Sequence, residues 1–151
     1  MTKESLSHID LDHFWPYQTV VLADQISRYT LDVVRSEAGL NQSQWRVLAA
    51  VADRPGRTAA EVTAVTPMDK TIVSRAVHSL IDSGLIQKIP SLDDKRRSSL
   101  EMTHLGAKKY RAIAKILNDT LTAPLTDGTT TEQFVEILKQ FSAQIKDIPQ
   151  K

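Results

Sequence analysis

The 151-residue sequence contains no cysteine, which excludes disulfides, thiolate zinc sites and thiol-based redox sensing. It also lacks any apolar run close to the roughly 20 residues that span a bilayer, so no membrane segment is expected. The first residues carry Glu4, Asp10 and Asp12, with no apolar run behind a basic start. They do not look like a secretory signal, and a cytoplasmic protein is the default expectation.

An excess of charge of one sign is also missing. The chain has 19 Lys and Arg residues against 18 Asp and Glu residues, for a net charge of +1. No strong field covers the whole protein, so a nucleic-acid role would need basic residues gathered at one place. The length fits one domain with a single core, and the 41% of hydrophobic and 25% of charged residues are ordinary for a globular protein.

The spacing of apolar residues predicts six helices and one short hairpin. The first helix is expected over about 12–37, with Gly39 stopping it. Asp69 and Thr103 are expected to cap the fourth helix, 70 to about 83, and the fifth. Three capping boxes predict where the second, third and sixth helices begin: Asn41 with Gln44, Thr58 with Glu61, and Thr130 with Gln133.

Two short strands are expected at 85–90 and 98–103, because Gly84 ends the fourth helix and the second strand alternates in polarity. The loop between them, 91–97, is polar and holds the densest basic run of the chain, Lys95-Arg96-Arg97. A cationic tip of this kind can enter the DNA minor groove, where negative potential attracts arginine. The alternative is a charged, solubilising loop.

The fourth helix has one apolar face, on which we expect Ile72, Val73, Ala76, Val77, Leu80 and Ile81. Its other face has hydrogen-bond donors and no acid, and consists of Lys70, Thr71, Ser74, Arg75 and His78. A solvated helix face usually mixes glutamate with lysine, whereas a helix in the major groove needs donors for bases and phosphates. The pattern favours DNA contact, with an ordinary amphipathic helix as the alternative.

At this point the sequence resembles the MarR family, the multiple antibiotic resistance regulators. The resemblance covers nearly the whole chain, and Met102 departs conservatively from the leucine that is usual before the last motif. The motifs that carry the resemblance, in chain order, are Gln44-Trp45-Arg46-Val47-Leu48, Lys70-Thr71-Ile72-Val73-Ser74-Arg75, Gly84-Leu85-Ile86, Asp94-Lys95-Arg96 and Thr103-His104-Leu105-Gly106.

The resemblance implies a mainly α (α+β) fold, a single 1–151 domain with a winged helix-turn-helix lobe over about 38–104. Helices within about 11–37 and 104–148 would join two protomers. The recognition helix would be 69–83 and the wing tip 91–97, with Arg96 as the wing arginine. Asp94 would orient the wing, since a carboxylate beside phosphate is repelled. Such proteins resemble dimeric repressors that bind near-palindromic double-stranded DNA and release it when a small ligand binds, without a cofactor.

An aromatic and basic set lies on the first two predicted helices. We hypothesise that Trp15, Tyr29, Trp45 and Arg46 line a ligand pocket, with Arg46 pairing the carboxylate of an aromatic acid. The alternative is core and interface packing. A metal site in the cluster His8, Asp10, Asp12 and His13 is disfavoured, because the spacing of the two histidines is not a standard helical pair.

Two other classes of function compete with DNA binding. A winged helix can serve as a protein-interaction module without specific DNA binding, because a fold does not fix function. An enzyme is not expected, since no nucleophile motif, phosphate loop, metal-ligand pair or convincing carboxylate pair is present in the sequence. The acid-free helix face and the basic tip favour DNA over a protein partner.

Overall fold

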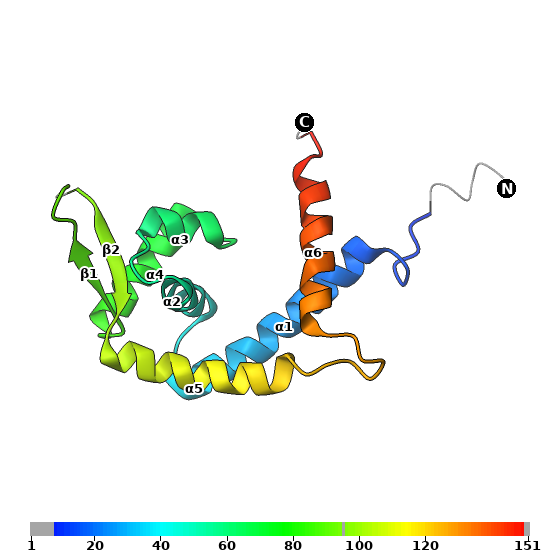
Figure 1. Ribbon diagram of the computed structural model, residues 1–151, viewed down its shortest axis with the longest axis horizontal. Helices are drawn as coiled ribbons and strands as arrows, with labels where there is room; N and C mark the ends of the chain where they lie inside the picture. Colours follow the sequence, from blue (N-terminus) through cyan, green and yellow to red (C-terminus); the bar gives the residue numbers. More distant parts are fainter. Residues whose placement is uncertain (1–7, 95, 150–151) are drawn as a thin grey trace. The chain divides into compact units, whose positions relative to one another are not determined.

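The computed structural model describes residues 8–94 and 96–149. Over these residues six helices and one two-stranded antiparallel sheet are found, which confirms the mainly α fold (Figure 1). The elements are α1 (Trp15–Ala38), α2 (Gln42–Asp53), α3 (Ala59–Val65), α4 (Lys70–Asp82), β1 (Ile86–Pro90), β2 (Ser98–Met102), α5 (His104–Leu121) and α6 (Thr131–Lys146). Contacts divide the chain into two compact units, of which one ends at Ile113 and the other begins at Ala114.

Helix α1 begins later than expected, at Trp15 rather than near Asp12. Phe14 is its N-cap and makes no side-chain cap bond, while Pro16 lies in the first turn, where its missing N–H costs nothing. The helix ends as predicted at Gly39, which takes a left-handed conformation with φ 64° and donates its N–H to the carbonyl of Arg35.

The three predicted capping boxes are confirmed. In each, the N-cap side chain accepts from the third helical N–H and the side chain at that third position accepts from the N-cap N–H. Asp69 caps α4 by accepting from the N–H of Ile72 at 2.8 Å. Because these bonds join residues only three apart, the sequence predicts where these helices begin.

The turn from α4 into β1 is a Schellman motif built on Gly84, which has φ 71°. The N–H of Gly84 donates to Ile81 and the N–H of Leu85 donates to Leu80, each at 2.9 Å. The left-handed residue reverses the chain directly after α4. The hairpin therefore starts at a fixed position relative to that helix.

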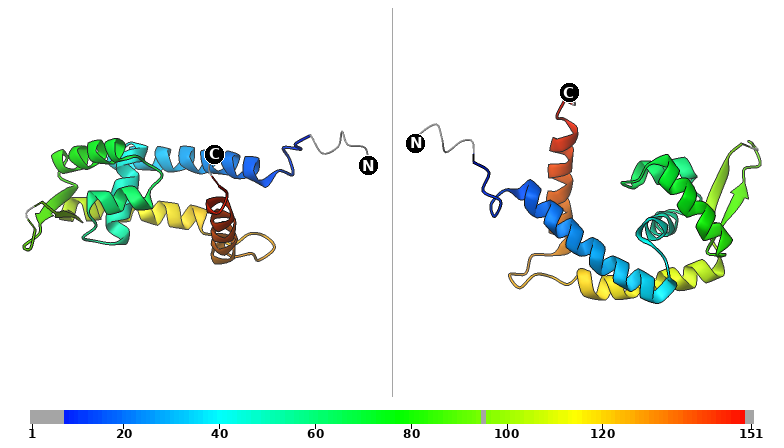
Figure 2. Two further views of the ribbon diagram at one scale, coloured as in Figure 1. Left: turned by 90° about the horizontal axis from the view of Figure 1, so that it is seen from above. Right: turned by 180° about the vertical axis from the view of Figure 1, so that it is seen from behind.

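Strands β1 and β2 pair in antiparallel register, with Ile86 opposite Met102 and Pro90 opposite Ser98. Backbone bonds also join Leu100 to the α2–α3 connection: Gly56 donates to Leu100 at 3.1 Å and Leu100 donates to Arg57 at 2.8 Å. The hairpin is thus fixed to the helices at its base and projects from them in all three views (Figures 1 and 2).

The start of α5 is packed against the turn that follows α4. Thr103 caps α5 by accepting from the N–H of Gly106 at 3.0 Å, and its hydroxyl donates to the carbonyl of Gly84 at 2.6 Å. Gly106 is buried, and a Cβ at this position would lie 1.9 Å from the carbonyl oxygen of Leu85. The glycine of the Thr103–Gly106 motif is therefore required by close backbone approach.

The core lies between α2, α3, α4 and the hairpin, and the fully buried residues come from these elements, α1 and α5. No residue of α6 is buried. None of the helices in the described ranges is long and apolar enough to cross a membrane. The largest side chains with under 2% exposure are Leu48, Leu80, Ile86, Leu100, Ile113, Val34, Val47, Val51, Val62, Val73 and Val77.

Candidate nucleic-acid interface

Helix α4 presents the predicted polar face to solvent, because α2 and α3 cover its other side. Buried Val73, Ala76, Val77 and Leu80 fix the rotation of the helix. The exposed residues include all five that the sequence predicts for DNA contact: Lys70, Thr71, Ser74, Arg75 and His78. Within the described residues, the side chains of Lys70, Thr71, Ser74 and Arg75 make no hydrogen bond or ion pair and are available to a ligand.

His78 differs from its neighbours on this face because its ring is anchored. Its Nδ1 lies 2.8 Å from the backbone carbonyl of Ser74. A carbonyl only accepts, so Nδ1 must carry the hydrogen and donate. Nε2 is then the atom left for an outside partner, as an acceptor when the ring is neutral and as a donor when it is protonated.

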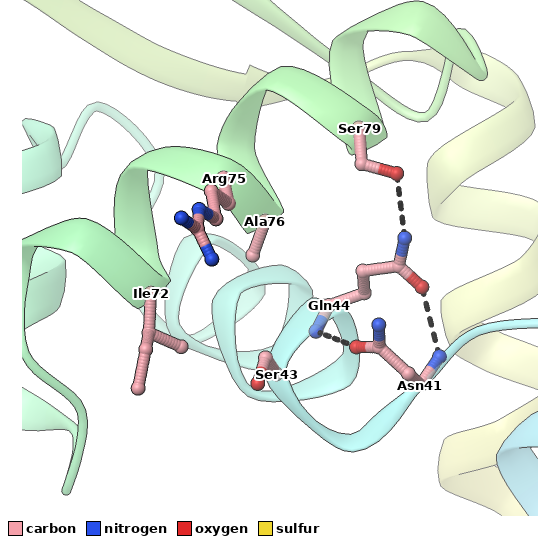
Figure 3. A pocket seen from close by; sticks show the side chains of 7 residues that line it. All are labelled: Asn41, Ser43, Gln44, Ile72, Arg75, Ala76 and Ser79. Atoms are coloured by element: carbon pink, nitrogen blue, oxygen red, sulfur yellow. Dashed lines mark hydrogen bonds between the residues drawn. The ribbon is translucent and has the colours of Figure 1, made fainter.

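Ile72 corrects the predicted apolar face. We expected it to be buried with Val73 and Ala76, but its side chain is 40% exposed. It lies in the first turn of α4, at the edge of the buried stripe, and lines a cavity of about 360 Å³ together with Arg75 and Ser43 (Figure 3). The helical period gives the order of positions around α4 but not the limits of what α2 and α3 cover.

The acid-free surface is confined to the first part of α4. Asp82, in its last turn, is exposed and is the only acidic residue of the helix. Residues near the N-terminus of a recognition helix are those that contact base edges. The donors therefore lie at the end of the helix that a recognition helix uses. The Asp69 carboxylate at this end accepts the N–H of Ile72, and Asp82 lies at the opposite end.

A hydrogen bond between side chains joins the N-terminus of α2 to α4 (Figure 3). Gln44 accepts the N–H of Asn41 at 2.8 Å through its oxygen and donates to the hydroxyl of Ser79 at 2.6 Å through its nitrogen. One amide thus completes the cap of α2 and joins that helix to the middle of the candidate recognition helix. Gln44, the first residue of the predicted motif Gln44-Trp45-Arg46-Val47-Leu48, therefore has a structural role.

In the hairpin loop, Arg96 and Arg97 are exposed, whereas Lys95 lies outside the described residues. Asp94 accepts the N–H of Arg96 at 2.9 Å through its side chain and the N–H of Arg97 at 3.0 Å through its carbonyl. Ser91 closes the loop by donating its N–H to the carbonyl of Arg97 at 2.9 Å. The carboxylate of Asp94 is therefore used to shape the turn that presents the arginines.

Glu61, in the first turn of α3, feels the charge of Arg97 in the hairpin loop. Its carboxylate accepts the backbone N–H of Thr58 at 2.8 Å and pairs with Arg54 at 3.1 Å. The bond from the Thr58 N–H, followed by the Thr58 hydroxyl and the positive charges of Arg54 and Arg97, holds the pKa of Glu61 below its ordinary value. Glu61 therefore stays ionised and partly offsets the charge of Arg97.

A second cavity, of about 310 Å³, lies along α2 and the α3–α4 turn. It brings together two of the four predicted ligand residues, Trp45 and Arg46. Trp45 also stacks on Tyr110 of α5, with ring centroids 5.7 Å apart and planes 20° apart. Trp15 and Tyr29 lie on α1 and are not among the residues that line this cavity.

Arg57 lines the same cavity and was missed by the sequence reasoning. Its guanidinium donates to the carbonyl of Ala50 at 2.6 Å and pairs with Asp53 at 2.8 Å, and its side chain is only 11% exposed. Among the described residues its Nε is buried with no hydrogen-bond partner. The only signal in the sequence was an aspartate four residues earlier, a spacing that suits an ion pair.

The N-terminal histidine and aspartate residues do not gather into a ligand set. His13 contacts Asp10, with Nδ1 2.8 Å from the carboxylate, and both side chains are exposed. Across 8–94 and 96–149 no group of three histidine or acidic residues is placed to hold a metal ion.

Residues 38–97 match the model of the MarR family. This segment contains α2, α3, α4 and most of the hairpin. The resemblance to the MarR family is confirmed. No curated protein matches the chain.

Solved structures of MarR regulators share the fold of almost the whole chain. The MarR/EmrR family transcriptional regulator from Acinetobacter sp. ADP1 is 18% identical with a TM-score of 0.77, over 93% of this chain and 100% of that one. A mutant MarR from E. coli, complexed with operator DNA, is 18% identical with a TM-score of 0.68, over 92% and 99%. The PcaV transcriptional regulator from Streptomyces coelicolor, in complex with its natural ligand, is 21% identical with a TM-score of 0.64, over 91% and 97%. This chain therefore has the fold of MarR family transcriptional regulators.

Proposed function

We propose that this protein is a dimeric, sequence-specific DNA-binding transcription regulator without enzymatic activity, acting in the cytoplasm. The observation that carries the proposal is the exposed, acid-free first part of α4, whose donors have no partner within the described residues. The basic hairpin follows α4 directly in the chain and contacts it. A similar fold in the E. coli MarR mutant is complexed with operator DNA, which supports the same role here.

In this proposal α4 lies in the major groove and the hairpin loop reaches the minor groove beside it. Arg75 donates two hydrogen bonds to guanine, while Thr71 and Ser74 reach base edges or phosphates. Lys70 neutralises phosphate, and His78 presents Nε2. Arg96 enters the minor groove, Arg97 and Lys95 add positive charge, and Asp94 keeps the turn in shape.

Two protomers would be joined through the terminal helices. Helix α6 buries none of its residues, and α1 exposes Val20, Leu22 and Ile26 at 66%, 39% and 43%. Apolar surface of this extent marks an interface. A two-fold dimer would place its recognition helices about 34–36 Å apart, or a multiple of this, to suit a near-palindromic operator.

DNA binding is tested by titrating the DNA upstream of the gene against an unrelated duplex at two salt concentrations. Specific binding that weakens with salt is expected. Arg75→Ala should cost about 1–3 kcal/mol of operator binding and relax the preference for one base pair, whereas Arg96→Ala should weaken binding across sequences.

The control is Arg28→Ala, which removes an exposed arginine that pairs with Asp24 on α1 and should leave binding unchanged. If Arg75→Ala and Arg96→Ala both bind like the parent, the assignment of the site is wrong. Equal, weak binding to both duplexes would favour the protein-interaction module instead.

The dimer is tested by sedimentation of an interface variant. Ile137 is 47% exposed on the apolar side of α6, and a buried, unpaired carboxylate there would be strongly unfavourable. Ile137→Asp should therefore sediment as a monomer at concentrations where the parent is a dimer. Lys139→Asp, on the opposite side of α6, should remain dimeric, and a monomeric parent would refute this part of the proposal.

We also propose that the regulator is a repressor released by a small aromatic acid bound beside Trp45 and Arg46. The cavity there is lined by Arg46 and Arg57, and Arg57 is already paired with Asp53, which also lines it. Arg46 is therefore the cation available to pair with a carboxylate. The PcaV structure of similar fold holds its natural ligand. Aromatic carboxylic acids should release the operator, and Arg46→Ala should abolish release while leaving operator affinity intact. Release that persists in Arg46→Ala would place the acid elsewhere.

A further inference from the structure

The exposed face of α4 is polar with one exception. Ile72 is 40% exposed among cationic and hydroxyl side chains, although α4 buries Val73, Ala76, Val77 and Leu80. Single exposed aliphatic residues are common on protein surfaces, so exposure alone carries no argument. Its position does, because Ile72 lies in the first turn of the helix that is proposed to enter the major groove.

Ile72 and Arg75 lie one turn apart on the same edge of α4. Both line the cavity next to Asn41 and Ser43, and in Figure 3 the two side chains extend from neighbouring turns of the helix. The Gln44–Ser79 bond holds α2 against the same edge of α4. Ile72 and Arg75 are therefore exposed on the same edge of α4, in consecutive turns.

Of the four bases, thymine alone presents a methyl group in the major groove, and an apolar side chain is what recognises it. We propose that Ile72 contacts the 5-methyl group of a thymine that neighbours the guanine bound by Arg75. The three residue steps from Ile72 to Arg75 rise about 4.5 Å along the helix, close to the roughly 3.4 Å step between base pairs. This inference rests on the proposed DNA-binding function and names one base of the operator half-site.

The test uses the operator once the DNA titration has identified it. Each thymine is replaced in turn by deoxyuridine, which removes only the methyl group. One thymine per half-site should show a loss of about fourfold in affinity, the effect of one buried methyl group. All other thymines should tolerate the replacement.

A protein–DNA double-mutant cycle assigns that loss to Ile72. Ile72→Ala should bind the thymine and deoxyuridine operators equally, whereas Ile72→Val should keep part of the preference. The control is Leu105→Ala, which removes an aliphatic side chain of similar exposure, 46%, from α5 and should retain the full discrimination. Because Ile72 is exposed, its variants should keep the melting temperature of the parent.

The outcomes separate this inference from the function on which it rests. If the operator binds specifically but no thymine is sensitive to deoxyuridine, or if Ile72→Ala keeps the full sensitivity, the inference is overturned and the regulator stands. If no duplex binds specifically, the proposed function fails and the inference fails with it.

Discussion

The winged-helix lobe and helix α6 differ in how they bury their apolar residues. Leu48, Leu80 and Leu100 of the lobe are at most 1% exposed, whereas Phe134, Ile137 and Leu138 of α6 are 41%, 47% and 38% exposed. The helical patterns of α4 and α6 are similarly amphipathic in sequence. The difference shows that periodicity indicates an apolar face but not whether the same chain or a second copy covers it.

The largest effect on stability is expected when one leucine of the lobe or of α6 is replaced by alanine. The two variants test whether the apolar faces of these regions are covered differently. Leu80→Ala leaves a cavity in the lobe and should lower the free energy of unfolding by about 2–5 kcal/mol at any protein concentration. Leu138→Ala should instead lower a stability that depends on protein concentration, because in the proposed dimer Leu138 packs against a second protomer. Urea unfolding at two protein concentrations distinguishes the two variants. Equal losses of stability that do not depend on protein concentration would contradict the difference between the lobe and α6.

A smaller effect is expected from Gly106→Ala, at the start of α5. The added methyl gains about 1 kcal/mol of helix propensity, but its 1.9 Å approach to the Leu85 carbonyl must be relieved by backbone movement, at a cost of about 1–3 kcal/mol. The clash should prevail and lower the melting temperature. Ala112→Ser, on the exposed side of α5, is the control and should stay within about 0.5 kcal/mol of the parent. A more stable Gly106→Ala would show that the turn at Leu85 and α5 separate easily.

Local chemistry explains what the sequence could predict. Asn41 bonds to Gln44 and Thr58 bonds to Glu61, in each case three residues apart. Residue type and spacing in the sequence therefore identify both pairs. The Schellman turn at Gly84 is likewise local. Such local features predict most helix boundaries and the place of the hairpin.

The features that the sequence does not predict correctly are of a different kind, because most of them depend on contacts between segments that are distant in the chain. The helical period predicts that Ile72 is buried, yet α2 and α3 do not extend far enough around α4 to cover it. Arg57 follows a loop glycine, where an exposed side chain is usual, and is buried by folding back onto the Ala50 carbonyl. The start of α1 was placed near Asp12 because the apolar period does not mark a start without a cap.

The smallest expected effect concerns the capping boxes of α3, in the lobe, and of α6, which close with different residues. The box of α3 closes with Glu61, whereas those of α2 and α6 close with Gln44 and Gln133. The Thr58 N–H, the largest cause, lowers the pKa of Glu61 in the folded protein. The stabilising contribution of Glu61 is therefore present above its unfolded-state pKa and is lost as the pH falls through the folded-state pKa.

Glu61→Gln keeps the acceptor for Thr58 but removes the charge, so it should weaken the loss of stability in acid while preserving α3. Gln133→Glu is the converse change in α6 and should add a loss in acid where the parent has none from this cap. Urea midpoints measured from neutral to acidic pH check both variants. A parallel pH profile for Glu61→Gln and the parent would show that the cap of α3, like that of α6, acts through hydrogen bonding alone.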